Sequence, residues 1–327
     1  MGLPDKLIAE IVEVGSKTPA GARLLDEAQA LLRLEAVGTK HVSQAESILP
    51  QFSRQLGPSA EYQAPGFIFE GGGQSAVEQI KALRVAADYK KLIPAESRVA
   101  VFGETHPEVG MRDELIKNMH IFENMGFTHL GMEALTTKRQ PLLDAFVAGS
   151  RSNATKAALT KALNDDWGWT TDSYLKLLDS AKSHGLKIVA LDRRVPANLE
   201  AASNTLREKQ WAKVVSEELK EAPNARALML VGNGHVGINP GRPDYLTSIL
   251  ARNELNPTVI SMNSTAVGTH SLFDKAVANG GMARDTFAVP VTAPIRPADF
   301  LVNIPPRNDP NFIRKVLVFN TNRNRYG

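Results

Sequence analysis

The sequence contains no cysteine, and this absence narrows the chemistry that it can support. Without thiols the chain can form neither a disulfide nor a thiolate nucleophile, and it cannot build a Cys-based zinc site. A metal ion would have to be held by His and carboxylate side chains. The absence of cysteine is compatible with both an oxidising and a reducing compartment.

The chain also lacks a strong charge of one sign. Its 38 Lys and Arg residues stand against 35 Asp and Glu residues, which gives a net charge of +3. There is no basic run with interleaved aromatic residues, so we expect no nucleic-acid partner. The first residues, 1–11, carry acids among the apolar positions and predict neither a secretory signal nor a membrane span. We therefore expect a cytoplasmic protein or one exported by a leaderless route.

The 327 residues are 43% hydrophobic, which is enough for a large core. Helical periodicity over residues 4–57 predicts a small helical N-terminal module at 1–57. This module lacks an evident basic and aromatic tip, so peripheral membrane contact is not its expected role. Residues 58–73 are rich in Pro and Gly and predict an irregular linker. The remainder, 74–327, is expected to be an α/β catalytic domain.

Within that domain, helices and apolar strands alternate. Continuous apolar runs separated by amphipathic helices predict a mostly parallel sheet covered by helices on both faces. We expect helices over 75–91 and from 197 to about 220, and a last short strand over 299–306 that leaves the sheet. The segment 134–187 is longer than one crossover needs. It predicts an inserted helical lobe beside the carboxyl edge of the sheet, where it would act as a lid.

Four of the expected strands stop on polar or ionisable residues. The strand at 99–102 runs into Gly-Glu-Thr-His at 103–106, and the strand at 130–132 runs into Glu133. The strand at 188–191 stops at Asp-Arg-Arg, and the strand at 227–231 stops at Gly-Asn-Gly-His. Parallel strands place their carboxyl ends along one edge, so these residues are expected to share one crevice.

A Glu and a His within hydrogen-bonding distance can activate a water for hydrolysis. We assign Glu133 or Glu104 as the general base, His235 as the acid or oxyanion stabiliser, and His106 as the orienting or proton-shuttling partner. Two carboxylates close together are also expected to raise the pKa of one of them.

Other groups at this edge could take part. Arg193 or Arg194 would give electrostatic support to the oxyanion. Alternatively, Glu104, His106, Glu133 and His235 could together hold a divalent ion such as zinc or manganese. The other histidines, such as His120, are expected to be structural.

The order of these motifs resembles a known superfamily. Gly-Glu-x-His, a Glu that closes the next strand, Asp-Arg-Arg and Gly-x-Gly-His occur in this order over about 98–305. Proteins with this pattern include erythromycin esterases, TIKI proteases, ChaN-type haem-uptake lipoproteins and the Ras-cleaving peptidase domain of bacterial toxins. In the peptidase branch, which has similar spacing, the corresponding active-site residues would be Glu104, His106, Glu133 and His235.

Two branches fit less well. The erythromycin esterases have one more residue between their Glu and His, and TIKI proteins have a Thr where Glu104 stands. The segment 169–191 also resembles the central segment of the ChaN branch. The members of that branch carry a lipobox Cys that is absent here, and the resemblance assigns no haem ligand to a residue of this sequence.

The resemblance implies a hydrolase of an amide or ester bond, for example a site-specific, effector-like or toxin-like protease that acts on a host or other target protein. No cofactor is expected in that case. The alternative is a protein of the ChaN type that binds haem or another tetrapyrrole without turnover. A third interpretation is an inactive scaffold that grips a partner in the crevice.

Overall fold

The computed structural model describes residues 73–106, 108–149, 153–167, 171–193, 203–220, 222, 224–238, 243–265, 272–291 and 298–306. The helical module predicted at 1–57 lies outside these residues, as does the linker up to residue 72. Both stay predictions.

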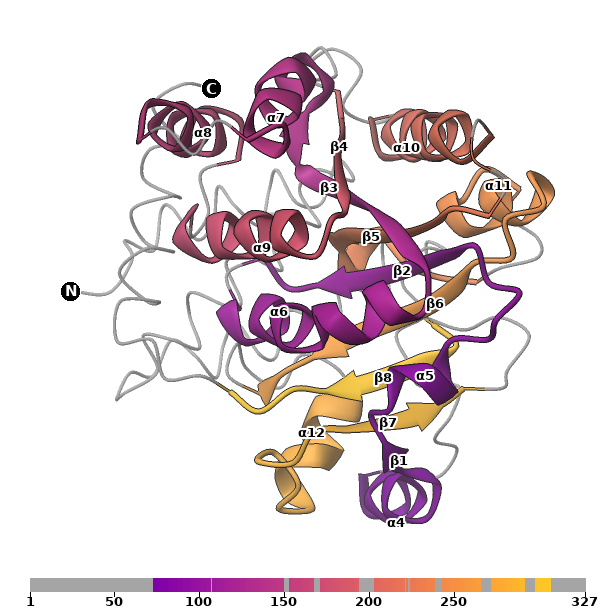
Figure 1. Ribbon diagram of the computed structural model, residues 1–327. Coiled ribbons are helices and arrows are strands. Elements are labelled where there is room, and N and C mark those ends of the chain that lie inside the picture. The colour runs from indigo at the N-terminus through magenta and orange to yellow at the C-terminus, as the bar shows by residue number, and fades with distance from the viewer. Residues whose placement is uncertain are drawn as a thin grey trace, which may run out of the picture.

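The described residues form one mostly parallel eight-stranded sheet (Figure 1). The strand order is β1-β7-β8-β6-β2-β5-β3-β4, in which only the β1/β7 and β7/β8 pairs are antiparallel. The strands are β1 Val85–Ala86, β2 Val99–Glu104, β3 Phe127–Thr136, β4 Lys187–Asp192, β5 Arg226–Gly232, β6 Thr258–Asn263, β7 Phe287–Pro290 and β8 Phe300–Asn303.

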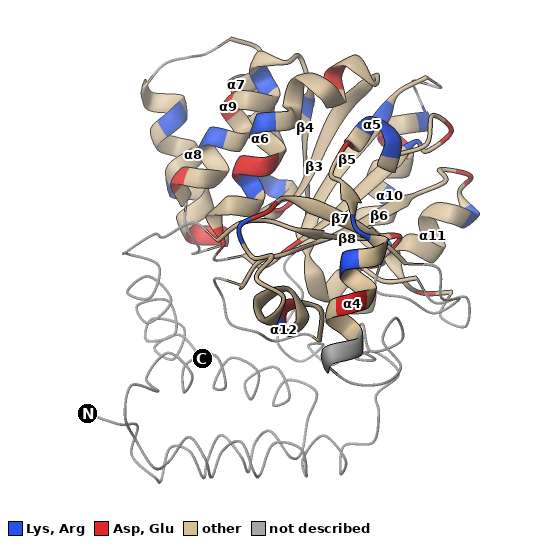
Figure 2. Ribbon diagram, turned by 90° about the horizontal axis from the view of Figure 1, so that it is seen from below, with Lys and Arg blue, Asp and Glu red and all other residues tan. Residues whose placement is uncertain are grey.

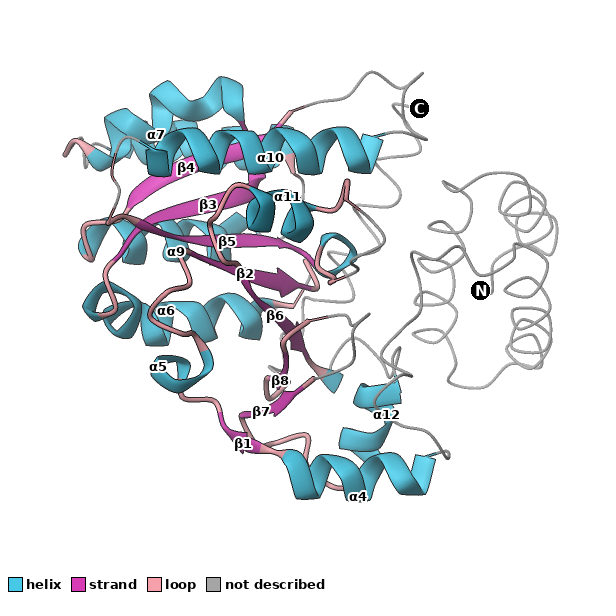
Figure 3. Ribbon diagram, turned by 90° about the vertical axis from the view of Figure 1, so that its right-hand side faces the viewer, coloured by secondary structure: helices cyan, strands magenta, loops and turns pink. Residues whose placement is uncertain are grey.

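Helices cover both faces of this sheet, which confirms the predicted fold class (Figure 3). Helices α6 and α9 pack on one face, and α10 and α11 pack on the other. Helices α4 and α12 pack together against the β7 end. The helices are α4 Gly73–Leu83, α5 Tyr89–Leu92, α6 Val109–Asn124, α7 Gln140–Val147, α8 Asn153–Asp166, α9 Thr171–Ser183, α10 Ser203–Lys220, α11 Leu246–Arg252 and α12 Leu272–Asn279, with short 3-10 turns η2 Thr137–Arg139 and η4 Asn233–His235.

Side-chain alternation explains why the central strands are apolar throughout. In β2, Val99 and Val101 join the core under α10 and α11, whereas Ala100 and Phe102 join the core under α6 and α9. Both faces are therefore dry, and a strand of this kind needs apolar residues at every position. The same alternation decides on which face of the sheet the polar residue that ends each strand will lie.

The predicted helix over 75–91 is wrong in its second half. Helix α4 ends at Leu83, and the short strand β1 then pairs with β7. A new helix, α5, begins after Asp88, whose carboxylate accepts a hydrogen bond from the Lys90 amide at 3.2 Å. An acidic side chain that caps a helix N-terminus marks a fresh start rather than a continuation.

The strand expected to leave the sheet over 299–306 is also placed differently. Strand β8 lies inside the sheet, between β6 and β7. Its last residue, Asn303, is fully buried and donates to the Asp285 carbonyl at 2.6 Å, so a polar side chain at this position is compatible with the interior. Strand β7, which pairs antiparallel to β8, was not predicted.

The expected lobe at 134–187 divides into two parts. Helix α9 lies on the sheet beside α6 and closes the β3-to-β4 crossover (Figure 1). Only η2, α7 and α8 remain as an addition, and they pack against the β3 and β4 side of the sheet. The expected helix from 197 to about 220 is observed as α10, which begins at Ser203; residues 194–202 lie outside the described part.

Positive and negative residues are interspersed over the described helices (Figure 2). This pattern matches the nearly balanced composition. None of the described helices combines the length and apolar character needed to cross a membrane.

Candidate functional site

Glu104 ends β2 on the face covered by α6 and α9, and its side chain is 2% exposed. Arg112 from α6 donates to one carboxylate oxygen, and the Tyr174 hydroxyl from α9 donates to the other. Nδ1 of His106 lies 3.2 Å from that second oxygen. Burial alone would raise the pKa of Glu104, but Arg112, His106 and Tyr174 outweigh it and lower the pKa. Glu104 is thus held as a carboxylate.

The imidazole of His106 is oriented by this carboxylate. An ionised carboxylate only accepts hydrogen bonds, so Nδ1 of His106 carries the proton, and in the neutral ring Nε2 is the acceptor atom. That Nε2 edge lies against Gly232, where a Cβ atom would come within 2.7 Å of it. The ring also makes an edge contact with Trp167 at the end of α8, with 4.5 Å between centroids. Residue 232 must therefore be glycine for His106 to lie as it does.

Glu133 lies in β3 on the opposite face of the sheet, toward α10, and is also buried. One carboxylate oxygen accepts from the Gly232 amide at 2.7 Å, and the other accepts from Arg207 at 2.6 Å. Nε2 of His235 lies 3.6 Å from the latter oxygen. Burial raises the pKa of Glu133, but His235, His106, Arg207 and the Gly232 amide together lower it to about 2. The expected rise in the pKa of one acid is therefore wrong, because each carboxylate contacts a guanidinium group.

His235 lies in η4, directly after β5, and is buried. Its Nδ1 is 2.9 Å from a carboxylate oxygen of Glu208 on α10, and its ring packs edge-on against Trp211. The other oxygen of Glu208 accepts from the Leu246 amide at 3.1 Å. His235 is thus oriented in the same manner as His106, and its Nε2 faces Glu133.

The arginine that supports Glu133 is not one of those predicted. Asp192, at the end of β4, accepts from Nε of Arg207 at 2.7 Å and so fixes the guanidinium beside Glu133. Arg193 comes after the end of β4 and is exposed. Arg194 lies outside the described residues. The support of an oxyanion by Arg193 or Arg194 stays a prediction, whereas the arginine that contacts Glu133 is Arg207.

The four predicted Glu and His residues lie together around Gly232, although 131 positions separate the first from the last. Sequence reasoning missed four charged or polar partners on the helices. The sequence pattern could have indicated two of them. Arg112 and Glu208 are charged residues within the apolar stripe of their helix, and each comes three positions before a buried apolar residue. The missed partners are Arg112, Tyr174, Arg207 and Glu208.

The carboxylates do not fit a metal centre. Glu104 and Glu133 each contact a guanidinium group, and a cation beside them would be repelled by that charge. Within the described ranges, no group of three or more His, Asp or Glu residues is arranged to hold a metal ion. The zinc or manganese alternative therefore lacks a suitable set of donors here.

The remaining described histidines lie elsewhere. His129 and His184 are next to Glu218 and Glu123, and His120 is exposed on α6. His41 and His270 lie outside the described residues.

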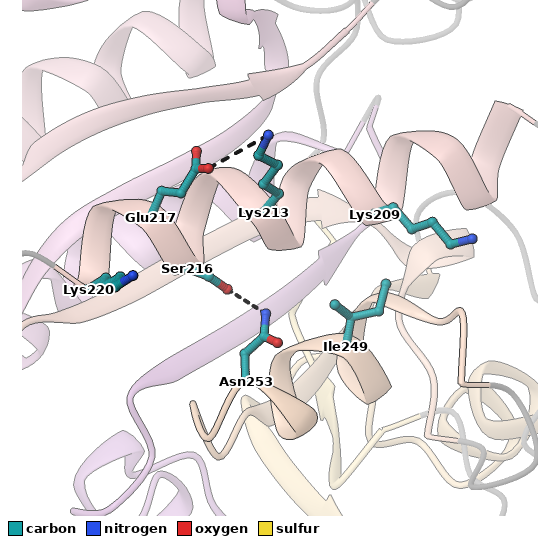
Figure 4. A pocket seen from close by; sticks show the side chains of 7 residues that line it. All are labelled: Lys209, Lys213, Ser216, Glu217, Lys220, Ile249 and Asn253. Carbon is teal, nitrogen blue, oxygen red and sulfur yellow. Dashed lines mark hydrogen bonds and ion pairs between the residues drawn. The ribbon is translucent and has the colours of Figure 1, made fainter.

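A separate cavity of about 230 Å³ lies between α10 and α11 (Figure 4). It is lined by side chains on the solvent side of α10, such as Lys209 and Lys213, and by Ile249 and Asn253 of α11. Glu208 is on the opposite side of the helix. The cavity is thus not part of the Glu and His cluster.

Comparison with known proteins agrees with the motif pattern. Residues 94–201 match the sequence model of a family described as haem-binding uptake, Tiki superfamily, ChaN. No curated protein matches the sequence.

Comparison with solved structures also found similar chains. The type III effector HopBA1 is 15% identical, with 65% of this chain and 90% of that chain covered and a TM-score of 0.47. The MARTX toxin effector domain RRSP from Vibrio vulnificus is 16% identical, with 70% of this chain and 46% of that chain covered and a TM-score of 0.41. ChaN of Campylobacter jejuni is 14% identical, with 64% and 88% covered and a TM-score of 0.36. The match of residues 94–201 to the family model confirms the resemblance to the superfamily that contains ChaN and TIKI proteins.

Proposed function

We propose that this protein hydrolyses an amide or ester bond with a pair of imidazoles that face a shared carboxylate. One observation carries the proposal. His106 and His235 each have Nδ1 held by a buried carboxylate, and both Nε2 atoms are turned toward the space around Glu133 and Gly232. This arrangement suits proton transfer to and from a bound water and a leaving group.

The imidazoles, rather than the carboxylates, are the better proton carriers. A general base works best when its pKa is near the working pH, and the pKa of Glu133 is about 2. Glu104 is occupied by Arg112 and Tyr174. We therefore assign an imidazole, and neither Glu133 nor Glu104, as the general base. In this proposal Glu133 stays ionised and stabilises whichever imidazole becomes positively charged.

The two imidazoles differ in access. The side chain of His106 is 17% exposed and that of His235 is 5% exposed. We assign His106 to take the proton from the attacking water. His235 donates to the leaving group from the form that is protonated on both ring nitrogens: the Nε2 proton is transferred and the Nδ1 proton stays with Glu208. Trp167, at the end of the α7–α8 addition, contacts His106 and supports a role of this addition as one wall of the substrate site.

The substrate class is tested with two panels, one of fluorogenic esters and one of peptides that cover varied sequences. We expect turnover by the wild type and a loss on the order of 10²- to 10⁴-fold in His106→Gln and His235→Gln. His120→Gln, on the exposed side of α6, is the matched control and should retain full activity. Turnover that is unchanged in both site variants would refute the proposal. Cleavage of peptides rather than esters would support a protease, and a screen of candidate host proteins would then identify the target.

A second candidate is haem binding without turnover, which the family match over 94–201 favours. The described side chains fit an axial ligand poorly, because the Tyr174 hydroxyl is buried against Glu104 and Nε2 of His106 lies against Gly232. Titration with hemin separates the two candidates. A Soret band at one-to-one stoichiometry that persists in Glu104→Gln, without hydrolysis of either panel, would favour haem binding.

A further inference from the structure

Glu208 is a carboxylate in an unusual place. It lies on α10, on the stripe that continues with Trp211 and Ala212 into the core, and it is only 6% exposed. A carboxylate at such a position is costly unless its oxygens are well partnered. Its neighbour Lys209 points instead to the outer cavity of Figure 4. The burial of Glu208 therefore calls for a specific partner.

Both oxygens of Glu208 accept hydrogen bonds from groups at the end of the sheet. Oε1 lies 2.9 Å from Nδ1 of His235, and Oε2 accepts from the Leu246 amide at 3.1 Å. Leu246 is the first residue of α11. Glu208 thus connects the imidazole of His235 to the start of α11.

We infer that Glu208 is a positioning residue that holds the Nδ1 proton of His235 and keeps Nε2 directed at Glu133. This inference rests on the proposed function for its effect on turnover, whereas its structural part stands alone. It gives the site two separate carboxylate–imidazole pairs, Glu104 with His106 and Glu208 with His235, on opposite sides of Glu133. The two pairs differ in charge, because Arg112 contacts Glu104, whereas among the described residues the basic side chain in contact with Glu208 is His235 itself.

Glu208→Gln is the informative substitution because it keeps the shape and changes the number of acceptors. A Gln side chain has one oxygen, so it cannot accept from both His235 and Leu246. If its amide group faces His235, Nδ1 must become the acceptor and the proton moves to Nε2. The matched control is Glu217→Gln on the outer face of α10, where Glu217 pairs with Lys213 at 3.7 Å (Figure 4).

The experiment measures the tautomers of the ring nitrogens by 15N NMR of His-labelled protein, with signals assigned from His106→Gln and His235→Gln. We expect the Nδ1–H tautomer for neutral His235 in the wild type and in Glu217→Gln. In Glu208→Gln we expect a change to Nε2–H, together with a fall in kcat of about 10²-fold or more and little change in KM.

The outcomes separate the two claims. A neutral wild-type His235 whose single proton is on Nε2 would overturn the inference, and this measurement needs no variant to fold. A Glu208→Gln variant in which both the tautomer and kcat are unchanged would also overturn it. If the wild type hydrolyses nothing in either panel, the proposed function fails, while the tautomer result still decides whether Glu208 positions the ring.

Discussion

Replacing Arg112 with Met tests the electrostatics that hold Glu104 in place. Arg112 is fully buried, and its guanidinium contacts a carboxylate that is 2% exposed. Removing one partner of a buried ion pair leaves an uncompensated charge and costs about 3–5 kcal/mol. Typical domains are stable by about 5–15 kcal/mol, so this loss would be a large fraction of the free energy of unfolding. At about 2–4 °C per kcal/mol, the melting temperature should fall by roughly 6–20 °C.

A double-mutant cycle identifies the cause of the loss. Glu104→Gln alone leaves the Arg112 charge buried, whereas Arg112→Met with Glu104→Gln leaves neither charge. The double variant should therefore lose less than the sum of the single losses, by about 1–3 kcal/mol.

Urea denaturation followed by far-UV circular dichroism gives each free energy of unfolding. The control is Lys161→Met, whose ion pair with Asp165 is exposed and contributes at most about 0.5 kcal/mol. A loss under about 1 kcal/mol in Arg112→Met, or additive losses in the cycle, would refute the reasoning.

Three further predictions concern Glu133, Gly232 and Arg207. The folded-state pKa of Glu133, about 2, lies below its ordinary value of 4.5, so about 3 kcal/mol of stability is present above pH 4.5 and is lost as the pH falls toward 2. In Glu133→Gln, the melting temperature should therefore fall less between pH 4.5 and pH 2 than it does in the wild type. An equal fall in both proteins would contradict this prediction. Gly232→Ala should displace His106 and reduce turnover, whereas Gly234→Ala, where a Cβ atom meets nothing within 4 Å, should not; equal activities would argue against the close approach. Asp192→Asn should weaken the hold on Arg207 and reduce turnover, while Arg193→Ala should change the free energy of unfolding by at most about 0.5 kcal/mol. Unchanged turnover in Asp192→Asn would contradict the role of Asp192 in holding Arg207.

The sheet could be predicted because its central strands are buried on both faces. Runs such as 99–102 and 227–231 are apolar at every position, and amphipathic helices separate them. The turns that close α6 and α9 were also predictable, since Gly126 and Gly185 adopt positive φ angles there. Strand β1 was missed because two residues carry no detectable period, and β7 and β8 were misjudged because sequence does not show which strands pair.

The site was predictable only as far as it lies at strand ends. Glu104 ends β2 and His235 follows β5, and the topology brings such positions to one edge. The expectation that a strand stops at Glu133 is wrong, because β3 runs on to Thr136; Glu133 instead follows Met132, the last residue of β3 that pairs with β5. The helical partners Arg207 and Glu208 were missed because charged residues on a helix are ordinarily exposed, and only the three-dimensional packing shows which of them turn inward.

The most direct test of the paired-imidazole account is a comparison of kcat/KM for His106→Gln, His235→Gln and the double variant on one substrate from the panels. Groups that act as a unit give strongly non-additive losses. We predict that the double variant loses little more activity than either single variant. Losses that multiply, or a single variant that retains wild-type activity, would contradict the account.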